Sequence, residues 1–212
     1  MKTIWLVVPC YNEEEVLPET SRQLKAVMNS MIEKGKISPE SKITFVNDGS
    51  KDGTWDIISS LCAEDCLFAG INLSRNRGHQ NALLAGLMTA KKKADMAISL
   101  DADLQDDVDV VEKMVDNFLA GDDIVYGVRS SRKTDTFFKR FTAEGFYKFM
   151  AAMGVEMVFN HADYRLMSRR ALEALSEFEE VNLFLRGIVP QIGFKTSTVE
   201  YERKERLAGE SK

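Results

Sequence analysis

Short apolar runs alternate with longer segments of helical periodicity along the chain, and this alternation constrains the fold more than any other feature. Strands that alternate with helices are typical of an α/β domain with a mainly parallel sheet. We therefore expect a central sheet flanked by helices. The strand-like runs are residues 3–9, 42–46, 68–73, 96–100 and 124–128.

The size and composition of the chain fit one such domain. With 212 residues and 44% hydrophobic content it can bury a substantial core, and no linker, repeat or low-complexity tract divides it. We therefore predict one domain over residues 1–212. The 28 basic and 33 acidic residues give a net charge of −5, which argues against a nucleic-acid binder that works by neutralising phosphates.

Signals for membrane insertion, secretion and disulfide formation are weak. No stretch approaches the roughly 18 to 20 consecutive apolar residues of a membrane-spanning helix. The apolar run 4–8 is too short for a signal peptide. Three cysteines provide neither a disulfide framework nor zinc-ligand spacing. We expect a soluble chain that does not itself cross a bilayer and that works in reducing, cytoplasmic surroundings.

Local signals add detail to the expected elements. Asn12 and Glu15 are spaced like a capping box, which predicts a helix over about residues 12–34. After residue 128 the pattern becomes less regular. The elements expected there are a helix over 136–153, a short strand over 164–167, a helix capped by Ser168, and a half-exposed strand over 194–201.

Polar residues follow three of the expected strands at the point where each strand ends. They form the segments Pro9-Cys10-Tyr11-Asn12-Glu13, Asn47-Asp48-Gly49-Ser50, and Asp101-Ala102-Asp103 with Gln105. Turns and helix caps explain any one segment alone, because Asn and Asp favour both. Their coincidence at the carboxyl edge of one sheet predicts a binding site, because ligands of open α/β sheets bind there.

Two aspartates separated by one residue form the most informative of these segments. Asp101 and Asp103 place two carboxylates just past a buried strand, where Mg²⁺ or Mn²⁺ could bind between them and the phosphates of a substrate. The pair therefore predicts a divalent ion bound together with a nucleoside diphosphate. We interpret Asp106, Asp107 and Asp109 as the acidic N-terminus of the following helix.

Four segments in this order resemble the family 2 inverting glycosyltransferases of the GT-A fold. They are the strand followed by PCYNEE, then NDGSKDGT, LSRNRGHQNALLAG and DADLQD. DADLQDD together with NHADYRLMSRR, FLRGIVPQIGF and RLAGESK resembles the polyprenyl-phosphate branch, which includes bactoprenol glucosyltransferases and dolichol-phosphate mannose synthases. The resemblance implies a GT-A-type, Rossmann-like domain, with residues 1–128 binding a nucleotide sugar and residues 129–212 binding the acceptor.

The resemblance also implies roles for the polar strand ends. The donor would be a nucleotide-diphosphate sugar, with a UDP-sugar favoured over a GDP-sugar, and the metal would be Mg²⁺ or Mn²⁺. The implied nucleotide-binding residues are Pro9, Tyr11, Asn12, Glu13, Asp48, Gly49, Asp101, Ala102 and Asp103. The implied metal ligands are Asp101, Asp103 and Gln105.

A basic stretch between residues 129 and 140 is the candidate acceptor site. It holds five basic residues against one aspartate, in a chain that is negative as a whole. A solvated surface loop is the alternative explanation, and we favour recognition of a second anion, because guanidinium groups pair with phosphate oxygens. In the resembling family this loop faces a lipid phosphate, which implies acceptor binding by Arg129, Arg132, Lys139 and Arg140. The implied acceptor residues also include Arg165 of the HADYRL segment and Arg206 of the terminal segment.

Asp163 resembles the carboxylate that the family places beside the acceptor, and with Arg129 and Arg140 it completes the expected catalytic set. A hydroxyl acceptor would need a base there, whereas a phosphate acceptor is already ionised. Asp163 could then orient the acceptor, balance the arginines, or form a structural ion pair with Arg165.

These observations predict sugar transfer to a polyprenyl phosphate at the cytoplasmic face of a membrane, with inversion at the anomeric carbon. Three alternatives remain at this level: transfer to a hydroxyl of a glycan with Asp163 as base, nucleotidyl transfer, and a regulator that binds sugar nucleotides without catalysis. The family's tail precedes membrane helices, so we expect either a shortened chain or a relative without an anchor. The sequence leaves open the sugar, the lipid and the oligomeric state.

Overall fold

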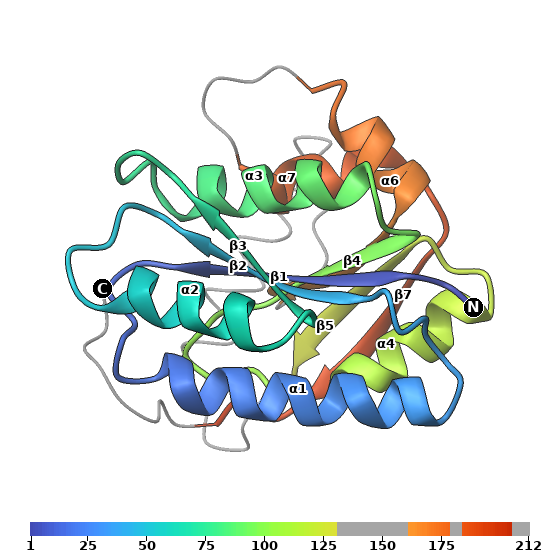
Figure 1. Ribbon diagram of the computed structural model, residues 1–212. Coiled ribbons are helices and arrows are strands. Elements are labelled where there is room, and N and C mark those ends of the chain that lie inside the picture. The colour runs from blue at the N-terminus through green and yellow to red at the C-terminus, as the bar shows by residue number, and fades with distance from the viewer. Residues whose placement is uncertain (131–160, 179–183, 205–212) are drawn as a thin grey trace.

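The computed structural model describes residues 1–130, 161–178 and 184–204. Its centre is a seven-stranded sheet in the order β3-β2-β1-β4-β6-β5-β7, shown edge-on in Figure 1. All neighbouring strands pair in parallel except β6, which runs antiparallel to both β4 and β5. The expected α/β architecture with a mainly parallel sheet is therefore confirmed.

The strands and helices of the first half alternate strictly along the chain. Their bounds are β1 Ile4–Cys10, α1 Leu17–Glu33, β2 Lys42–Asn47, α2 Thr54–Glu64, β3 Phe68–Asn72, α3 His79–Lys91, β4 Met96–Ser99, α4 Val110–Leu119 and β5 Ile124–Arg129. The elements that follow are β6 His161–Ser168, α6 Arg169–Leu175, α7 Leu185–Ile188, the 3₁₀ helix η1 Val189–Ile192, and β7 Thr196–Tyr201.

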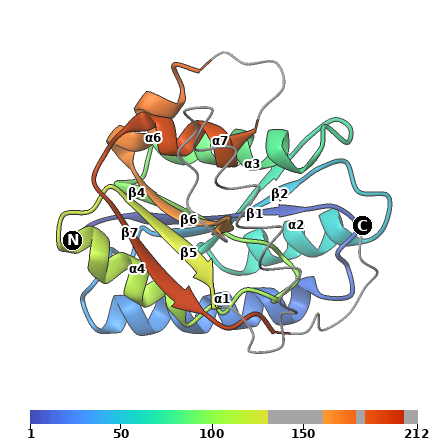
Figure 2. The same ribbon diagram turned by 180° about the vertical axis from the view of Figure 1, so that it is seen from behind.

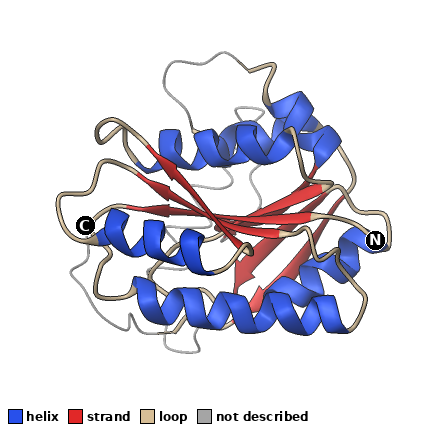
Figure 3. Ribbon diagram, in the orientation of Figure 1, coloured by secondary structure: helices blue, strands red, loops and turns tan. Residues whose placement is uncertain are grey.

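Helices cover both faces of the sheet and divide the apolar interior into two cores (Figures 2 and 3). One core lies between the sheet and α1, α2 and α4, and includes Leu6, Phe45 and Met114. The other lies between the sheet and α3, α6 and α7, and includes Val7 and Leu87. Leu6 and Val7 belong to different cores because successive side chains of a strand point to opposite faces. This burial on both faces explains why β1 is apolar throughout.

The first helix begins later than the capping-box pattern predicts. Helix α1 starts at Leu17, Val16 provides no side-chain cap, and Pro18 occupies the first turn, where its missing N–H costs no hydrogen bond. Asn12 instead adopts a positive φ of 52°, and its side-chain oxygen accepts the N–H of Lys51 at 2.8 Å. Asn12 therefore joins the loops that follow β1 and β2, and the predicted role as helix cap is wrong.

The later elements match the sequence expectations only in part. Strand β6 is longer than the run predicted for it, and Ser168 does cap α6, because its hydroxyl accepts the N–H of Ala171. The helix predicted over 136–153 lies outside the described residues. Within the described residues, no helix is both long enough and apolar enough to cross a bilayer.

Asp123 connects the start of β5 to the start of α6. Its carboxylate, 7% exposed, accepts the hydroxyl of Ser168 at 2.8 Å and pairs with the guanidinium of Arg170. Its backbone oxygen accepts the N–H of Ser168 at 2.7 Å. The hydrogen bond from Arg170 lowers the pKa of Asp123 below its ordinary value, although burial opposes this shift. Asp123 thus joins the start of β5 to the end of β6 and the start of α6.

We expect Asp123→Asn to lower the free energy of unfolding by about 1–3 kcal/mol near pH 7, because removal of a buried charged hydrogen-bond partner costs about that much stability. Because the pKa of Asp123 is lower in the folded than in the unfolded protein, its ionised carboxylate stabilises the fold at pH values above the unfolded pKa of ~3.9. This stabilisation is lost as the pH falls towards the pKa of the folded protein. The difference from the wild-type protein, measured by urea unfolding, should therefore shrink below about pH 4. Asp116→Asn, which removes the exposed pair with Lys36, serves as control and should leave the stability nearly unchanged.

Candidate functional site

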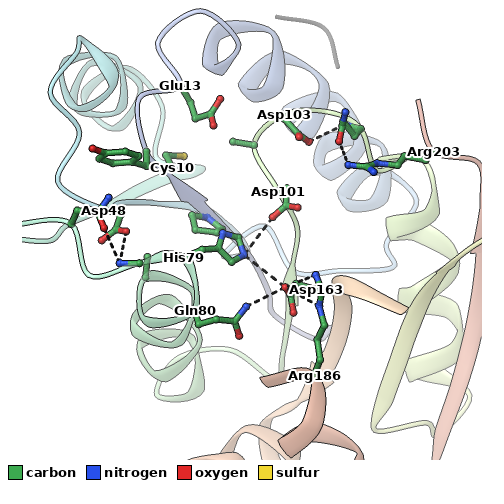
Figure 4. Close-up of a pocket in the computed structure, with 17 residues that line it drawn as sticks. Cys10, Glu13, Asp48, His79, Gln80, Asp101, Asp103, Asp163, Arg186 and Arg203 are labelled. Carbon is green, nitrogen blue, oxygen red and sulfur yellow. Dashed lines mark hydrogen bonds and ion pairs between the residues drawn. The ribbon is translucent and has the colours of Figure 1, made fainter. Parts of the chain in front are cut away.

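A pocket of about 870 Å³ opens at the carboxyl ends of β1, β2 and β4. Figure 4 shows its labelled side chains, with Asp48 and Cys10 on one side, Asp101 in the middle, and Asp163 with Arg186 on the other. The position follows from the topology, because the carboxyl ends of parallel strands meet at one edge and leave room between the loops. This is the edge at which the sequence predicts a binding site.

Buried and partly exposed residues alternate in the loop that follows β4. Asp101, Ala102, Asp103 and Gln105 of this loop line the pocket. Ala102, Leu104 and Asp106 are at most 7% exposed, whereas Asp101 and Asp103 are partly exposed and line the pocket. This period of two arises because the apolar members of the loop join the core of α1 and α4. The core therefore presents both carboxylates to the same cavity.

Several contacts hold this loop in place. The hydroxyl of Thr20 on α1 donates to the backbone oxygen of Ala102 at 2.6 Å. The hydroxyl of Tyr201, at the end of β7, donates to Asp106 at 2.5 Å. The backbone N–H of Lys204 donates to the backbone oxygen of Gln105 at 2.9 Å. Asp106 is therefore a buried anchor, and its interpretation as a helix N-terminal acid is wrong, because α4 begins only at Val110.

Asp101 lies where negative charge is poorly compensated. Burial, together with the nearby carboxylates of Asp106, Asp103 and Asp163, raises the pKa of Asp101 to about 6, while His79 opposes the shift. The imidazole nitrogen Nε2 of His79 lies 3.6 Å from the Asp101 carboxylate. A bound cation would relieve this repulsion.

The oxygen atoms available at Asp101 and Asp103 suit a hard divalent ion. Across the described residues, no group of three or more His, Cys, Asp or Glu side chains could hold a metal ion by itself. Two carboxylates completed by substrate phosphates and waters are the usual ligand set of Mg²⁺, whereas structural zinc needs four protein ligands. The residues fit Mg²⁺ or Mn²⁺ delivered with a phosphate-bearing substrate. The side-chain oxygen of Gln105, the third predicted ligand, accepts a hydrogen bond from Arg203.

The opposite side of the pocket contains the predicted nucleotide wall. Pro9, Tyr11, Glu13 and Asp48 line it. The carboxylate of Asp48 is 3% exposed and accepts the backbone N–H groups of Arg77 at 2.6 Å and Gly78 at 2.9 Å. Asp48 therefore fixes the loop that leads into α3 and still borders the cavity.

The backbone of Gly49 packs closely against the same loop. Its φ is 65°, and a side-chain carbon built on it would lie 2.5 Å from the backbone of Arg75 and Asn76. Only glycine combines this conformation with so close an approach. The predicted residues Asn12 and Gly49 are not among those that line the pocket, and both hold the strand-end loops together.

Asp163 belongs to a closed ring of hydrogen bonds that joins three elements. Arg165 donates to one carboxylate oxygen of Asp163 at 2.5 Å, and the side chain of Gln80 donates to the other at 3.2 Å. Arg165 also donates to the backbone oxygen of Leu185 at 3.2 Å, while the N–H of Leu185 donates to Gln80 at 3.3 Å. The ring fixes β6, α3 and α7 relative to one another.

Arg186 adds a second guanidinium to Asp163. Its Nε and Nη2 lie 3.3 and 3.0 Å from the same carboxylate oxygen that Gln80 contacts. Burial alone would raise the pKa of Asp163, but the charge of Arg165 and the hydrogen bonds of Arg186 outweigh it, so the pKa of Asp163 is lowered. With both oxygens engaged and a lowered pKa, Asp163 is a poor general base.

The predicted acceptor residues are distributed unevenly. Arg129 ends β5 and contacts the hydroxyl of Tyr201 at 3.3 Å and Asp106 at 3.5 Å. Arg165 is 2% exposed and its guanidinium is engaged by Asp163 and Leu185, so its position does not support acceptor binding and matches the alternative of a structural ion pair. Arg132, Lys139, Arg140 and Arg206 lie outside the described residues.

Sequence reasoning missed the roles of Arg186, Gln80 and Arg203, which line the pocket. Arg186 and Gln80 lie inside FLRGIVPQIGF and LSRNRGHQNALLAG, so the two segments were recognised although the residues were not. No local pattern distinguishes Arg186 from a surface arginine, because its partner Asp163 is 23 residues away in the sequence.

Solved structures with this arrangement define the class of fold. Glucosyl-3-phosphoglycerate synthase from Mycobacterium tuberculosis, solved with Mn²⁺ and UDP, superposes with a TM-score of 0.63 at 16% identity, over 97% of this chain and 72% of that one. A mannosyltransferase from Pyrobaculum calidifontis, solved with GDP-mannose and Mn²⁺, gives a TM-score of 0.63 at 16% identity, over 94% and 55%. The fold is that of the GT-A glycosyltransferases.

The sequence comparisons identify the family. The profile of Glycosyl transferase family 2 matches residues 5–176, and the chain belongs to this family. It is 55% identical to the Bacillus subtilis protein named uncharacterized glycosyltransferase YkoT, over 98% of this chain and 61% of the relative. It is 41% identical to the bactoprenol glucosyl transferase of Shigella phage SfV, over 99% and 66%. The chain thus spans less than two thirds of the length of these relatives.

Proposed function

We propose that this family 2 domain transfers a sugar from a nucleoside-diphosphate sugar to a polyprenyl phosphate, with inversion at the anomeric carbon. We favour a UDP-sugar as the donor over a GDP-sugar. The acceptor lipid lies in the cytoplasmic face of a membrane. The identity of 41% to bactoprenol glucosyl transferases supports the choice of acceptor.

The observation that carries the proposal is the division of one pocket into two chemically different ends. The carboxylates of Asp103 and Asp101 make one end and the middle of the pocket acidic, and the Arg186 guanidinium lies at the other end, beside Asp163. A sugar donor with a metal-bound diphosphate needs the first end, and a second phosphate needs a cation. A site for a neutral hydroxyl acceptor would need a free base in place of the engaged Asp163.

The residues of this chain divide the work in the proposed reaction. The wall formed by Pro9, Tyr11 and Asp48 would hold the nucleoside. Asp101 and Asp103, with Gln105, would hold Mg²⁺ or Mn²⁺, which supplies Lewis-acid stabilisation of the departing diphosphate when it is bound. The ring around Asp163 would keep the acceptor end rigid, so that the reacting groups meet in a fixed orientation.

Sugar transfer to different acceptors tests the proposal. The protein is incubated with a UDP-sugar and Mn²⁺, and the release of UDP is measured with a polyprenyl phosphate, with the corresponding polyprenol, and with an oligosaccharide. We expect release with the polyprenyl phosphate at least about a hundredfold faster than with the polyprenol, because only the phosphate is an ionised nucleophile at pH 7.

Other outcomes identify the alternatives. Faster release with the oligosaccharide would favour a hydroxyl acceptor. Donor binding, detected as a rise in melting temperature, without any release of UDP would favour a regulator. Formation of pyrophosphate from a nucleoside triphosphate would favour a nucleotidyltransferase. The same thermal shifts with UDP and GDP compare the two donor classes.

A further inference from the structure

We infer that Arg186 binds the phosphate group of the acceptor by exchanging its contact with Asp163 for that phosphate. This assignment depends on the proposed function for the nature of the acceptor. It adds a binding residue that the sequence pattern did not indicate, and it rests on the position, charge and geometry of Arg186 beside the pocket.

The first step is the difference in exposure between the two arginines that contact Asp163. The Arg165 side chain is 2% exposed, whereas that of Arg186 is 44% exposed and lines the pocket. A ligand in the pocket therefore reaches Arg186 and cannot reach Arg165. Figure 4 shows Arg186 beside Asp163, across the pocket from Asp48.

The second step concerns charge. Arg165 lies 2.5 Å from Asp163 and by itself balances the charge of that carboxylate. Arg186 is a further positive charge on the same group. Asp163, Arg165 and Arg186 therefore carry one positive charge in excess. The Asp101 carboxylate lies on the far side of His79, whose Nε2 is 3.6 Å from Asp101 and 4.0 Å from Asp163. The free face of the Arg186 guanidinium is thus the position at which this side of the pocket attracts an anion.

The third step concerns the geometry of the contact. Nε and Nη2 of Arg186 both point to one oxygen of Asp163, because Arg165 engages the other oxygen. Arg186 therefore lacks the paired contact to two oxygens that makes arginine–carboxylate pairs strong. Water can solvate the exposed Arg186 guanidinium when it leaves the buried carboxylate, and a phosphate that offers two oxygens can make the paired contact that Asp163 does not.

The fourth step is that the backbone of α7 is fixed while the Arg186 side chain is accessible. Both backbone polar groups of Leu185 are engaged, its oxygen by Arg165 and its N–H by Gln80. The Arg186 Cα is consequently held, and only side-chain torsions need to change for the exchange. Asp163 keeps Arg165 and Gln80 as partners throughout, so it remains compensated when Arg186 leaves.

Binding of farnesyl phosphate and farnesol tests this inference without sugar transfer. Dissociation constants are measured by calorimetry in the presence of UDP and Mn²⁺. We expect the wild-type protein to bind farnesyl phosphate at least about tenfold more tightly than farnesol, and Arg186→Ala to reduce this ratio below about threefold, because the guanidinium supplies charge-assisted hydrogen bonds. Arg186→Lys should give an intermediate ratio, because it retains the charge but not the fork.

Controls separate this inference from its rivals. Arg22→Ala removes an arginine that is 68% exposed on α1, pairs with Glu19 and does not line the pocket, and it should leave the ratio unchanged. Affinity for UDP with Mn²⁺ should stay within about twofold in Arg186→Ala, since the donor is held at the other end. A comparable loss of UDP affinity would overturn the inference and assign Arg186 to the donor diphosphate.

Two further results would also overturn it: a ratio near ten in Arg186→Ala, or a wild-type protein that does not distinguish farnesyl phosphate from farnesol. The proposed function is tested separately, by sugar transfer with the wild-type protein. If the ratio responds to Arg186 but no sugar is transferred to a polyprenyl phosphate, the function is wrong and the phosphate contact remains. If sugar is transferred to a polyprenyl phosphate but the ratio does not respond to Arg186, the proposed function stands and the phosphate contact of Arg186 is wrong.

Discussion

Replacing Asp103 with alanine should lower the rate of sugar transfer by at least about a thousandfold, or ~4 kcal/mol in the activation barrier, because the proposed metal site would lose one of two carboxylates. The side chain of Asp103 is partly exposed, and its contact with the protein is a local hydrogen bond from the N–H of Gln105 at 3.1 Å. Folding should therefore survive the change, with a loss of stability of no more than about 1 kcal/mol.

Calorimetry with UDP separates a loss of metal binding from a loss of nucleotide binding. In the wild-type protein, UDP should bind more tightly with Mn²⁺ than without it, and in Asp103→Ala this difference should vanish. Asp109→Ala changes an exposed aspartate six residues further along the chain, and it should leave both turnover and the effect of Mn²⁺ intact. Full turnover in Asp103→Ala would remove the metal from the proposed mechanism.

The part of the fold that depends on local pattern was predictable from the sequence. Strands β1, β2 and β4 are buried on both faces. β1 and β4 appear in the sequence as apolar runs, β2 is interrupted by Thr44, and polar residues follow each of the three. The start of α1 was not predictable in this way. Asn12 satisfies its side chain through Lys51, 39 residues away, and this tertiary contact replaces the local capping that its spacing suggests.

The residues of the candidate site were likewise predictable from the sequence only in part. Asp101 and Asp103 could be predicted because a strand end and a spacing of two residues place them together. The ring around Asp163 could not, because its hydrogen bonds join residues 83 and 105 positions apart in the sequence. The reversed strand β6 brings Asp163 beside β4, and no feature of residues 161–168 alone reveals with which strand they pair.

Asp163→Ala should lower the free energy of unfolding by about 3–5 kcal/mol, because it leaves the buried guanidinium of Arg165 without its counter-ion. Arg165 is 2% exposed, and of its two hydrogen-bond partners described above only the backbone oxygen of Leu185 would remain. The measurement is urea unfolding at pH 7, monitored by the fluorescence of the native tryptophans. Glu19→Ala, which removes the exposed partner of Arg22, is the matched control and should leave the stability close to that of the wild-type protein.

A double variant distinguishes an uncompensated charge from a general loss of packing. Asp163→Asn combined with Arg165→Met removes both charges and keeps the side-chain volumes similar, so its stability should lie within about 2 kcal/mol of wild type and above that of Asp163→Ala. If the double variant is instead the less stable of the two, burial of charge is not the cause. The result also bears on catalysis, because inactivity of Asp163→Ala at a temperature where it unfolds cannot identify Asp163 as a base. Sugar transfer by the folded double variant, even at a reduced rate, would show that the reaction does not need the Asp163 carboxylate as a proton acceptor.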